Sequence, residues 1–497
     1  MSVIILHSNT SAKAINVDVR SASIISDALS YDVEGAAFQT GFKLGTWNAK
    51  RSFAKIKTVA GAQVIYFEAG FVNLVRRSLA ENGIDVSIRD MRTPLDFDRS
   101  ELNLAGIEPH DYQINAIEAA IYHKRGIIRA ATGSGKTEMA VGITQVIAKR
   151  TLFLTHKLDL VNQTRKRYHA RMGRSVGMVS EGEFFPSDIT VATVQTLLAQ
   201  LKSNPERTVK FLESIEVLIV DEAHRASGDI FFRVIMSCVN AYYRIGLTAT
   251  PLMKGNREDD LKLIACTGDV IYNVTNGDLI ARGILAQPFF TFCEVPRFPM
   301  ADGSSVSKNA YPAVYKAGIV ENVARNQMIL EETRFLVEKG RKVVVLVKEI
   351  KHGKLLESIF RSDGVRCVWV YGADDASERD AALQGLTDGR LDVVISSTIL
   401  DEGLDCPAIS AVVLAGGGKS KISLFQRVGR SVRAKKGAEL EANGNTAEII
   451  DFIDTGDRRL MRHSALRFKA VKEEDGWIVR AIIPFKERSK RFLPTAA

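Results

Sequence analysis

The 497-residue sequence has few of the features that mark secreted, zinc-binding or membrane proteins. Its five cysteines include no C-x-x-C pair, which argues against a zinc site and fits a reducing cytoplasm. No apolar run is long enough to cross a bilayer. The start, Met1-Ser-Val-Ile-Ile-Leu-His7, lacks a basic segment and a long apolar core, so we expect no signal peptide. These absences predict a cytoplasmic protein with no membrane partner.

Acidic residues are missing from one long stretch, Gly35–Phe67. The basic residues in it are Lys43, Lys50, Arg51, Lys55 and Lys57. The formal net charge of the chain, +9, favours a polyanionic partner. Because Trp47 and Phe53 are interleaved with these charges, the stretch resembles a nucleic-acid surface more than a merely solvated face. We therefore expect Lys50, Arg51, Lys55 and Lys57 to bind DNA, although solvation alone explains such a run as well.

Length and periodicity predict about three domains. The first is a small α+β unit with one amphipathic helix, Phe71–Glu81. Its expected strands are Val3–Leu6, Ala14–Val19, Phe53–Val59, Gln63–Phe67 and Ile84–Ile88. From about residue 107, two series of five apolar strands alternate with helices and predict two α/β domains with parallel sheets. The expected domains are residues 1–98, 99–290 and 331–497, with an interdomain joint at residues 291–330.

The most informative motif is Arg129-Ala-Ala-Thr-Gly-Ser-Gly-Lys-Thr137, between a predicted strand and a predicted helix. Gly133 and Gly135 allow backbone N–H groups to close on phosphates, Lys136 can reach the β and γ oxygens, and the Thr137 hydroxyl can ligate Mg²⁺. Ala130 replaces the usual first glycine. A glycine-rich surface loop is the alternative interpretation. The expected nucleotide-binding residues are Ala130, Ala131, Thr132, Gly133, Ser134, Gly135, Lys136 and Thr137.

A pair of carboxylates follows another strand-like run, Val217–Val220, about eighty residues downstream. In open parallel sheets, ligands bind at the carboxyl ends of strands. We therefore expect Asp221 to hold Mg²⁺ and Glu222 to position the attacking water. Phosphoryl transfer to water depends mainly on positioning and charge neutralisation, which these groups can supply.

Two arginines late in the chain are candidate arginine fingers. Arg430 and Arg433, in Gln426-Arg-Val-Gly-Arg-Ser-Val-Arg433, are expected three apart on one face of a helix. Their guanidinium groups could reach the γ-phosphate from the second α/β domain. An exposed basic helix is the alternative, but the presence of a P-loop favours the catalytic role.

With these motifs in place, the chain resembles a superfamily 2 helicase over roughly residues 105–470. In order, the matching segments are His110–Gln113 (Q motif), Leu154–Lys157 (Ia), Val191–Thr196 (Ib), Gly246–Pro251 (III), Val345–Lys348 (IV) and Ser397–Asp405 (V). The resemblance implies two tandem RecA-like parallel-sheet domains preceded by a small α+β domain. It also implies ATP and Mg²⁺ as cofactors.

The same resemblance implies roles for further residues. The residues expected to bind ATP are Tyr112, Gln113, Gly403 and Asp405. Gln426 is expected to take part in catalysis, in addition to Glu222, Arg430 and Arg433. The residues expected to bind DNA are Thr155, His156, Lys157, Thr193, Gln195, Lys348 and Thr398. Threonine or glutamine at these places can also serve as a capping group at a strand end. Contacts to the phosphate backbone imply little sequence preference.

Within the superfamily, the chain is similar to the UvsW-type phage helicases and the XPB-like enzymes. The similarity lies in Asp221–Ala226 with Tyr243–Thr250, in Gly318–Asn326, in Ile350–Gly353 and, in the N-terminal region, in Gly41–Asn48 and Arg89–Arg92. It implies an ATP-driven helicase that remodels forks and four-way junctions in replication, recombination or repair, in the host cytoplasm if a phage encodes it. The alternatives are an RNA helicase, the motor of a restriction system, and a DNA-binding module that uses ATP only as a switch.

Overall fold

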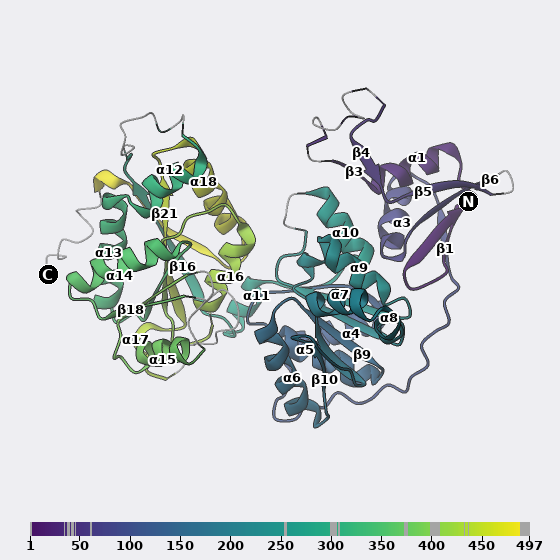
Figure 1. Cartoon of the computed structure of the whole chain (residues 1–497), viewed down its shortest axis with the longest axis horizontal. Helices are drawn as coiled ribbons and strands as arrows, with labels where there is room; N and C mark the ends of the chain where they lie inside the picture. Colours follow the sequence, from purple (N-terminus) through teal and green to yellow (C-terminus); the bar gives the residue numbers. More distant parts are fainter. Residues whose placement is uncertain are drawn as a thin grey trace. The chain divides into compact units, whose positions relative to one another are not determined.

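The computed structural model describes residues 2–33, 35–36, 40, 44, 46–59, 62–252, 256–298, 306, 309–371, 376–397, 408–431, 433–435 and 437–487. The chain forms two compact units (Figure 1). The first contains Met1–Ala131 and Gly135–Val274, and the second contains Thr275–Ala497 with Thr132–Ser134. The first unit holds an N-terminal domain and an eight-stranded sheet, and the second holds a seven-stranded sheet.

The N-terminal domain is a five-stranded sheet in the order β5-β6-β2-β1-β7. Its strands are β1 (Ser2–Leu6), β2 (Ser11–Ile15), β5 (Lys55–Val59), β6 (Ala62–Glu68) and β7 (Val86–Asp90). Only the β1–β7 pair is parallel. The remaining elements are α1 (Val19–Ala28), α3 (Val72–Glu81), the 3-10 turn η2 (Ala69–Phe71), and the separate pair β3 (Ser30–Asp32) and β4 (Lys50–Ser52). The α+β class of this domain is as predicted.

One predicted strand of this domain is wrong. The expected strand Ala14–Val19 stops at Ile15, and helix α1 begins at Val19. The cause is Asp18, whose Oδ1 accepts a 2.7 Å hydrogen bond from the Ser21 amide and so caps the helix. Ala22 and Ile25 then turn their side chains into the core, at a helical spacing.

The eight-stranded sheet has the order β11-β10-β12-β9-β13-β14-β8-β15, and every pair except β10–β11 is parallel. Its strands are β8 (Arg125–Ala130), β9 (Thr151–Thr155), β10 (Gly177–Ser180), β11 (Glu183–Phe185), β12 (Ile189–Thr193), β13 (Val217–Asp221), β14 (Tyr243–Thr248) and β15 (Val270–Val274). Its helices are α4 (Asp111–His123), α5 (Lys136–Ile147), α6 (Leu158–Met172), α7 (Val194–Ser203), α8 (Pro205–Glu213), α9 (Asp229–Ser237) and α10 (Arg257–Thr267), with the 3-10 turn η3 (Ala223–Ser227). All five strands predicted for this region are present.

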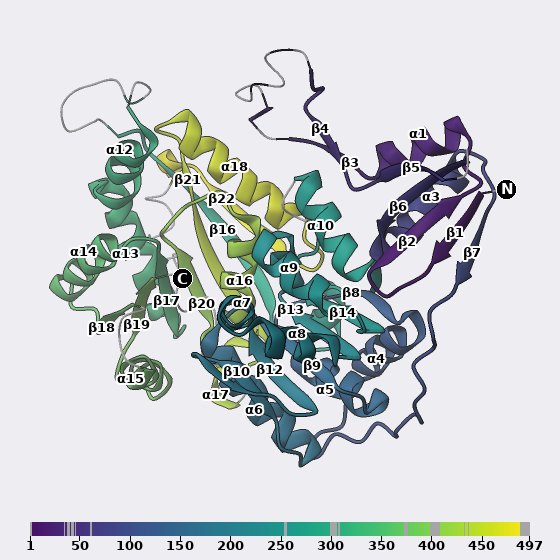
Figure 2. The same cartoon turned by 45° about the vertical axis from the view of Figure 1, so that its right-hand side comes forward.

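Helix α10 belongs to the cores of both parts of the first unit. Leu261, Ile264 and Ala265 join the hydrophobic cluster of the N-terminal domain, and both views show α10 beside that domain (Figures 1 and 2). Gly70 is required at this contact, because a Cβ there would overlap the carbonyl oxygen of Ile264. The guanidinium of Arg257 donates to the carbonyl of Ser30 at 2.7 Å and to that of Ala28 at 2.8 Å. The N-terminal domain is therefore packed onto the eight-stranded sheet and not merely tethered to it.

The seven-stranded sheet is entirely parallel, in the order β18-β19-β17-β20-β21-β16-β22. Its strands are β16 (Gln287–Val295), β17 (Val343–Val347), β18 (Cys367–Val370), β19 (Val393–Ser397), β20 (Ala411–Leu414), β21 (Thr446–Asp454) and β22 (Ile478–Ile483). Its helices are α11 (Asn276–Ala281), α12 (Tyr311–Tyr315), the π-helix η5 (Lys316–Val320), α13 (Val323–Glu338), α14 (Ile350–Ser362), α15 (Ala376–Thr387), α16 (Lys421–Ser431), α17 (Gly437–Asn443) and α18 (Arg458–Glu473). Two tandem parallel-sheet domains are thus confirmed.

The boundary between the units lies earlier than the sequence suggests. The division falls between Val274 and Thr275, and β16 lies inside the seven-stranded sheet, between β21 and β22. Residues 291–330 therefore belong to the second unit and do not form a joint. Pro288 is the misleading signal: pairing with β22 begins only at Phe289, so this proline lies at the strand end, where a missing N–H is tolerated.

Candidate nucleotide and nucleic-acid site

The P-loop connects β8 to α5. Gly133 and Gly135 have φ values of 88° and 81°, a left-handed backbone that lets successive amides turn inward at little steric cost. Lys136 begins α5 directly after this turn, and its Nζ donates to the carbonyl of Ala130 at 3.3 Å. Thr137 lies in the first turn of the same helix. Anions are favoured at such a helix N-terminus, so the loop has the local geometry of a phosphate cradle.

Helix α4 brings the predicted adenine-binding glutamine to this loop. The Oε1 of Gln113 accepts a 3.0 Å hydrogen bond from the His110 amide and so caps the first turn of α4. The amide of Gln113 reaches Gly135, where a Cβ would overlap its Nε2. Tyr112 is buried, and its ring stacks on that of His110 with centroids 5.5 Å apart. Adenine recognition by Tyr112 and Gln113 stays a prediction.

The carboxyl ends of five neighbouring strands form one row of polar groups. In register, Thr193 of β12 lies opposite Thr155 of β9, and Asp221 of β13 lies opposite Leu247 of β14. The P-loop strand β8 pairs with β14, so the P-loop and Asp221 leave the sheet with only one strand between them. Parallel strands place these ends at the same edge, where open sheets bind ligands.

Glu222 adopts a strained backbone conformation, with φ 46° and ψ 51°. Its Oε2 lies 3.3 Å from Nδ1 of His224, and the same nitrogen lies 3.0 Å from the Thr248 hydroxyl. The Thr248 hydroxyl also accepts the amide of Thr250 at 3.2 Å. His224 therefore ties the carboxylate after β13 to the end of β14, a link between two motifs that the sequence alone does not reveal.

The two carboxylates have opposite pKa shifts. Burial, and then the neighbouring Glu222 carboxylate, raises the pKa of Asp221. Burial also works to raise the pKa of Glu222, but the hydrogen bond to His224 and the charge of Lys136 outweigh it and hold that pKa low. The pair thus contains one carboxylate that stays ionised, Glu222, and one partly buried carboxylate, Asp221, whose ionised form a nearby cation would stabilise.

Three of the predicted DNA residues at the edge of the eight-stranded sheet are wholly or partly buried. The side chain of Thr155 is fully buried, so its hydroxyl is not accessible to a DNA phosphate. Thr193 is 5% exposed and caps α7, its Oγ1 accepting the Thr196 amide at 3.4 Å. Burial, and then the charge of Arg225, lowers the pKa of His156 to about 4.

The other two predicted DNA residues at the edge of the eight-stranded sheet are accessible. Gln195 is exposed, and its Nε2 donates to the carbonyl of His156 at 3.2 Å. Lys157 is partly exposed and immediately precedes α6. A phosphate could therefore meet Lys157 and Gln195 at this edge, while the threonines beneath them shape the backbone.

In the second unit the structure corrects one expectation. Helix α16 ends at Ser431, and the backbone of Arg433 forms a β-bridge with Leu285. Arg430 and Arg433 are therefore not on one helical face, because the chain is extended at Arg433. The side chains of Gln426 and Arg430 lie outside the described part of the structure, as do Thr398, Gly403 and Asp405.

Lys348, the remaining predicted DNA residue of the second unit, is exposed directly after β17. Its Nζ lies 5.3 Å from the centroid of the Tyr315 ring. This cation–π contact directs the ammonium group while leaving it in contact with water.

The predicted DNA residues of the N-terminal domain lie on its surface. Lys50 and Arg51 in β4, and Lys55 and Lys57 in the edge strand β5, are all exposed. The expectation for Phe53 is wrong, because its ring packs into the core against Tyr31 and Phe71, with centroids 5.8 and 5.3 Å away. Trp47 is partly exposed, and its indole N–H donates to the Lys50 carbonyl at 2.7 Å.

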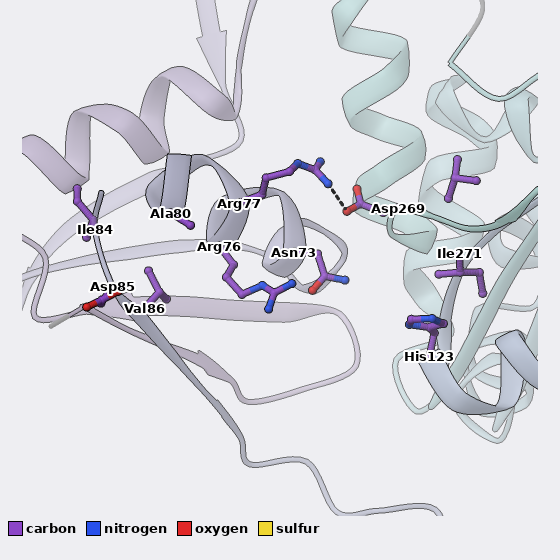
Figure 3. Close-up of a pocket in the computed structure, with 11 residues that line it drawn as sticks. Asn73, Arg76, Arg77, Ala80, Ile84, Asp85, Val86, His123, Asp269 and Ile271 are labelled. Atoms are coloured by element: carbon purple, nitrogen blue, oxygen red, sulfur yellow. Dashed lines mark hydrogen bonds and ion pairs between the residues drawn. The ribbon is translucent and has the colours of Figure 1, made fainter. Parts of the chain in front are cut away.

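A cavity of about 710 Å³ separates α3 of the N-terminal domain from the edge strand β15 (Figure 3). Arg77 and Asp269, from opposite sides, form an ion pair at 3.2 Å. The cavity contains none of the predicted site residues. Among the described residues there is also no cluster of three or more His, Cys, Asp or Glu that could hold a metal. No described helix has the length and apolar character needed to cross a membrane.

Two known families match the chain, one in each unit. The family described as "Type III restriction enzyme, res subunit" matches residues 106–253, and "Helicase conserved C-terminal domain" matches residues 324–435. The first match covers β8 to β14 and the second covers β17 to β20, the strands whose ends carry the motifs. The chain belongs to the superfamily 2 helicases. This helicase is therefore an ATP-hydrolysing enzyme, and its tandem domains are the RecA-like pair of that superfamily.

Several known proteins resemble the helicase over most of its length. The DNA 3'-5' translocase XPB2 of Sulfurisphaera tokodaii is 26% identical, covering 78% of this chain and 90% of the relative. The ATP-dependent DNA helicase uvsW of Enterobacteria phage T4 is 23% identical, covering 86% of each. In fold, the helicase is similar to S. cerevisiae Dbp5 bound to RNA and ADP BeF3, with a TM-score of 0.52, 16% identity, and coverage of 77% of this chain and 92% of that one.

Proposed function

We propose that the helicase uses ATP hydrolysis to move along DNA and to remodel branched DNA such as forks and four-way junctions. The observation that carries the proposal is the carboxyl edge of the eight-stranded sheet, where the charge of Lys136, at the start of α5, acts on both Asp221 and Glu222. The two relatives named above, a DNA translocase and a DNA helicase, support DNA as the substrate. The phage relative also supports action in the cytoplasm of a host cell.

The residues at this edge fit Mg²⁺. The fit rests on the oxygen donors gathered here and on the raised pKa of Asp221, a partly buried carboxylate that is ionised more readily beside positive charge. Asp221 and the hydroxyl of Thr137 would hold the ion, with nucleotide phosphates supplying further oxygens. When bound, Mg²⁺ neutralises charge on the β and γ phosphates.

The side chains and backbone amides of the site would then have separate roles in hydrolysis. Lys136 would contact the phosphates, while the backbone amides of the P-loop would orient them. Glu222, which stays ionised, would orient the attacking water, and His224 would hold its carboxylate in place. The strained backbone at Glu222 fits this role, because strain of that kind gathers at functional sites.

Arg430 and Arg433 are proposed, by resemblance, to contact the γ-phosphate in the transition state. Replacing either with Ala is expected to lower kcat by about 10³-fold, the lower end for arginine fingers, with little change in ATP affinity. Steady-state ATPase assays over a range of ATP concentrations separate the two effects. Normal kcat in both variants would remove the arginines from the mechanism.

One experiment tests the proposed function as a whole. ATPase stimulation and strand separation are measured on single strands, forks, four-way junctions, DNA–RNA hybrids and RNA duplexes. We expect the strongest response to branched DNA. Unwinding of RNA duplexes without any activity on DNA would establish an RNA helicase instead.

The restriction-enzyme family matched by residues 106–253 favours one further candidate, the motor of a restriction system. Such a motor would need partner subunits for cleavage and methylation. It would translocate on unbranched duplex DNA with no preference for junctions, and the same set of substrates reveals this.

A further inference from the structure

A group of positive charges surrounds one histidine on the surface of the second unit. His463 lies on α18 and is partly buried. Burial, followed by the charges of Lys419, Arg467, Arg462 and Lys348, lowers its pKa. These cations come from three segments, namely the end of β17, the loop after β20, and α18 itself. The fold therefore gathers charges that lie more than a hundred residues apart in sequence.

Three of the four cations form no ion pair within the described part of the chain. Arg467 is buried and pairs with Asp451, its Nε lying 2.8 Å from Oδ2. Lys348, Lys419 and Arg462 are exposed, and no carboxylate of the described residues pairs with any of them. Like charges held together in this way repel one another, and a bound polyanion would offset that repulsion.

Two acids near Tyr311 are already neutralised inside the protein. Asp454 accepts the Nε of Arg325 at 2.8 Å, and Asp457 accepts the Nε of Arg459 at 3.0 Å. With these two acids paired, the exposed Glu349, next to Lys348 in sequence, contributes one negative charge against the three surface cations. The patch around His463 is therefore positive on balance.

The patch is supported by aromatic rings and held rigidly. Tyr311 of α12 and His463 have ring centroids 5.4 Å apart, and the Tyr311 hydroxyl lies 3.4 Å from Nδ1 of His463. The Tyr315 hydroxyl donates to the carbonyl of Gly416 at 2.7 Å. α12 is thereby joined to the loop after β20.

That loop is fixed to α18 as well. The guanidinium of Arg467 donates to the carbonyl of Gly418 at 2.7 Å, one residue before Lys419. Packing of Val314, Tyr315 and Leu460 in one apolar cluster joins α12 to α18. Lys419 and Arg462 are therefore presented by a fixed framework and not by a free loop.

We propose that Lys348, Lys419 and Arg462, together with the rings of Tyr311 and His463, bind the backbone of a single DNA strand. The inference rests on the proposed function and extends it, because it adds α12, α18 and the loop after β20 to the predicted contact at Lys348. Exposed cations beside half-buried rings suit a single strand, in which phosphates meet the charges and unpaired bases can stack on the rings. A surface that binds an acidic protein, or one that only keeps the chain in solution, is the alternative.

The test compares two double variants of the full-length protein. In Lys419→Gln/Arg462→Gln the patch loses two charges. In the control, Lys339→Gln/Lys342→Gln, the same charge is removed from residues that precede β17, whereas Lys348 follows it. The five-residue strand separates the two ends by about 17 Å. Binding of labelled oligo(dT) is measured by fluorescence anisotropy between 50 and 200 mM salt, with unfolding midpoints recorded for each protein.

We expect the patch variant to bind oligo(dT) more weakly. The plot of log K against log[salt] should also be less steep by about 1.4, which is about 0.7 for each phosphate of a single strand that the protein no longer neutralises. The control should keep the parental slope, and Lys419→Arg/Arg462→Lys should keep most of it. If the patch variant unfolds early, Lys419→Gln alone, which removes one exposed surface charge, should lower the slope by about 0.7.

An unchanged slope, or an equal decrease in the patch variant and the control, would overturn the proposal. So would a weakening confined to duplex DNA. Failure of the proposed function has a different result: the parent protein itself would show neither DNA-stimulated ATPase nor binding to oligo(dT).

Discussion

The two parallel sheets of the helicase present similar carboxyl edges but different charges. At the edge of the eight-stranded sheet, Asp221 and Glu222 are partly buried, and their pKa values move in opposite directions. At the edge of the seven-stranded sheet, Lys348 and Lys419 are exposed and have no acidic partner among the described residues. On the roles proposed above, the first edge serves chemistry on a small ligand, whereas the second attracts a long anion.

This difference shows which residues determine the function of each of two similar parallel-sheet domains. Parallel βα units supply an edge at which loops converge, and only the few residues after each strand decide what the edge does. A variant at the first edge should therefore change turnover, and a variant at the second should change binding and its dependence on salt.

The largest effect is expected for Lys136→Ala. Removing the ammonium that faces the phosphates should lower ATP hydrolysis by at least about 10³-fold, because charge neutralisation dominates phosphoryl transfer. Binding to DNA should be largely retained. Phosphate release and oligonucleotide binding are measured in parallel, with Lys166→Ala, an exposed lysine on α6, as the control. Unimpaired hydrolysis would refute the P-loop assignment.

Glu222→Gln should lower kcat by about 10²–10³-fold while ATP affinity is kept, since only the charge that orients water is removed. Equilibrium binding of a fluorescent ATP analogue and single-turnover hydrolysis separate the two quantities. Glu213→Gln, at the exposed end of α8, is the matched control. A large decrease in affinity with normal turnover at saturation would contradict this role.

A third variant extends the contrast to the N-terminal domain. Neutralising Lys50, Arg51, Lys55 and Lys57 should weaken binding to forked duplex and lower the salt slope by up to about 3.6, or about 0.9 for each duplex phosphate that is no longer neutralised. Strand separation should fall with it. The control neutralises four exposed basic residues elsewhere in the first unit, namely Lys166, Lys202, Lys210 and Arg233. If both variants bind forks like the parent at every salt concentration, these charges only solubilise the domain.

The smallest effect concerns a buried group in the seven-stranded unit. His352 is fully buried on α14, with Nε2 2.9 Å from Oδ1 of Asn326. Burial, and then the charge of Arg325, lowers its pKa to about 3. The unfolded chain takes up a proton below about pH 6.5, and the folded protein does so only near pH 3. Above pH 6.5 the titration of His352 therefore does not change the free energy of unfolding. As the pH falls from 6.5 towards 3, it lowers the free energy of unfolding progressively.

His352→Gln should remove this dependence. The stability difference between parent and variant should narrow by about 1.4 kcal/mol for each pH unit between 6 and 5. Urea unfolding followed by the fluorescence of Trp369 and Trp477, which both lie in the second unit, reports it. A constant difference across that range would mean that His352 is protonated in the folded protein.

Strong periodic signals made most of the fold predictable. The ten strands expected in the two parallel sheets are present because buried parallel strands appear in sequence as continuous apolar runs. The strands β10, β11, β15, β16 and β22 were not predicted. Pro288 made β16 resemble a turn, and in β22 the apolar run Ile478–Ile483 is interrupted by Arg480.

The site was predictable where chemistry and short motifs coincide, as at Lys136 and Asp221. The approach of distant segments to one another was not. The proximity of Gln113 to Gly135, the link from His224 to Thr248, and the charges around His463 all depend on the folded register. A single sequence contains these residues but not their distances.

Helix α10 also limits how the protein can be divided. Because Leu261, Ile264 and Ala265 complete the core of the N-terminal domain, a chain shortened to begin at residue 99 would expose this apolar face to water. We expect such a truncated protein to aggregate, as size-exclusion chromatography would show, unless polar residues replace those three. A soluble and monodisperse truncated protein would contradict the shared core. The N-terminal domain thus covers an apolar face of the first motor domain. A shorter relative could lose the N-terminal domain only if its α10 were also changed.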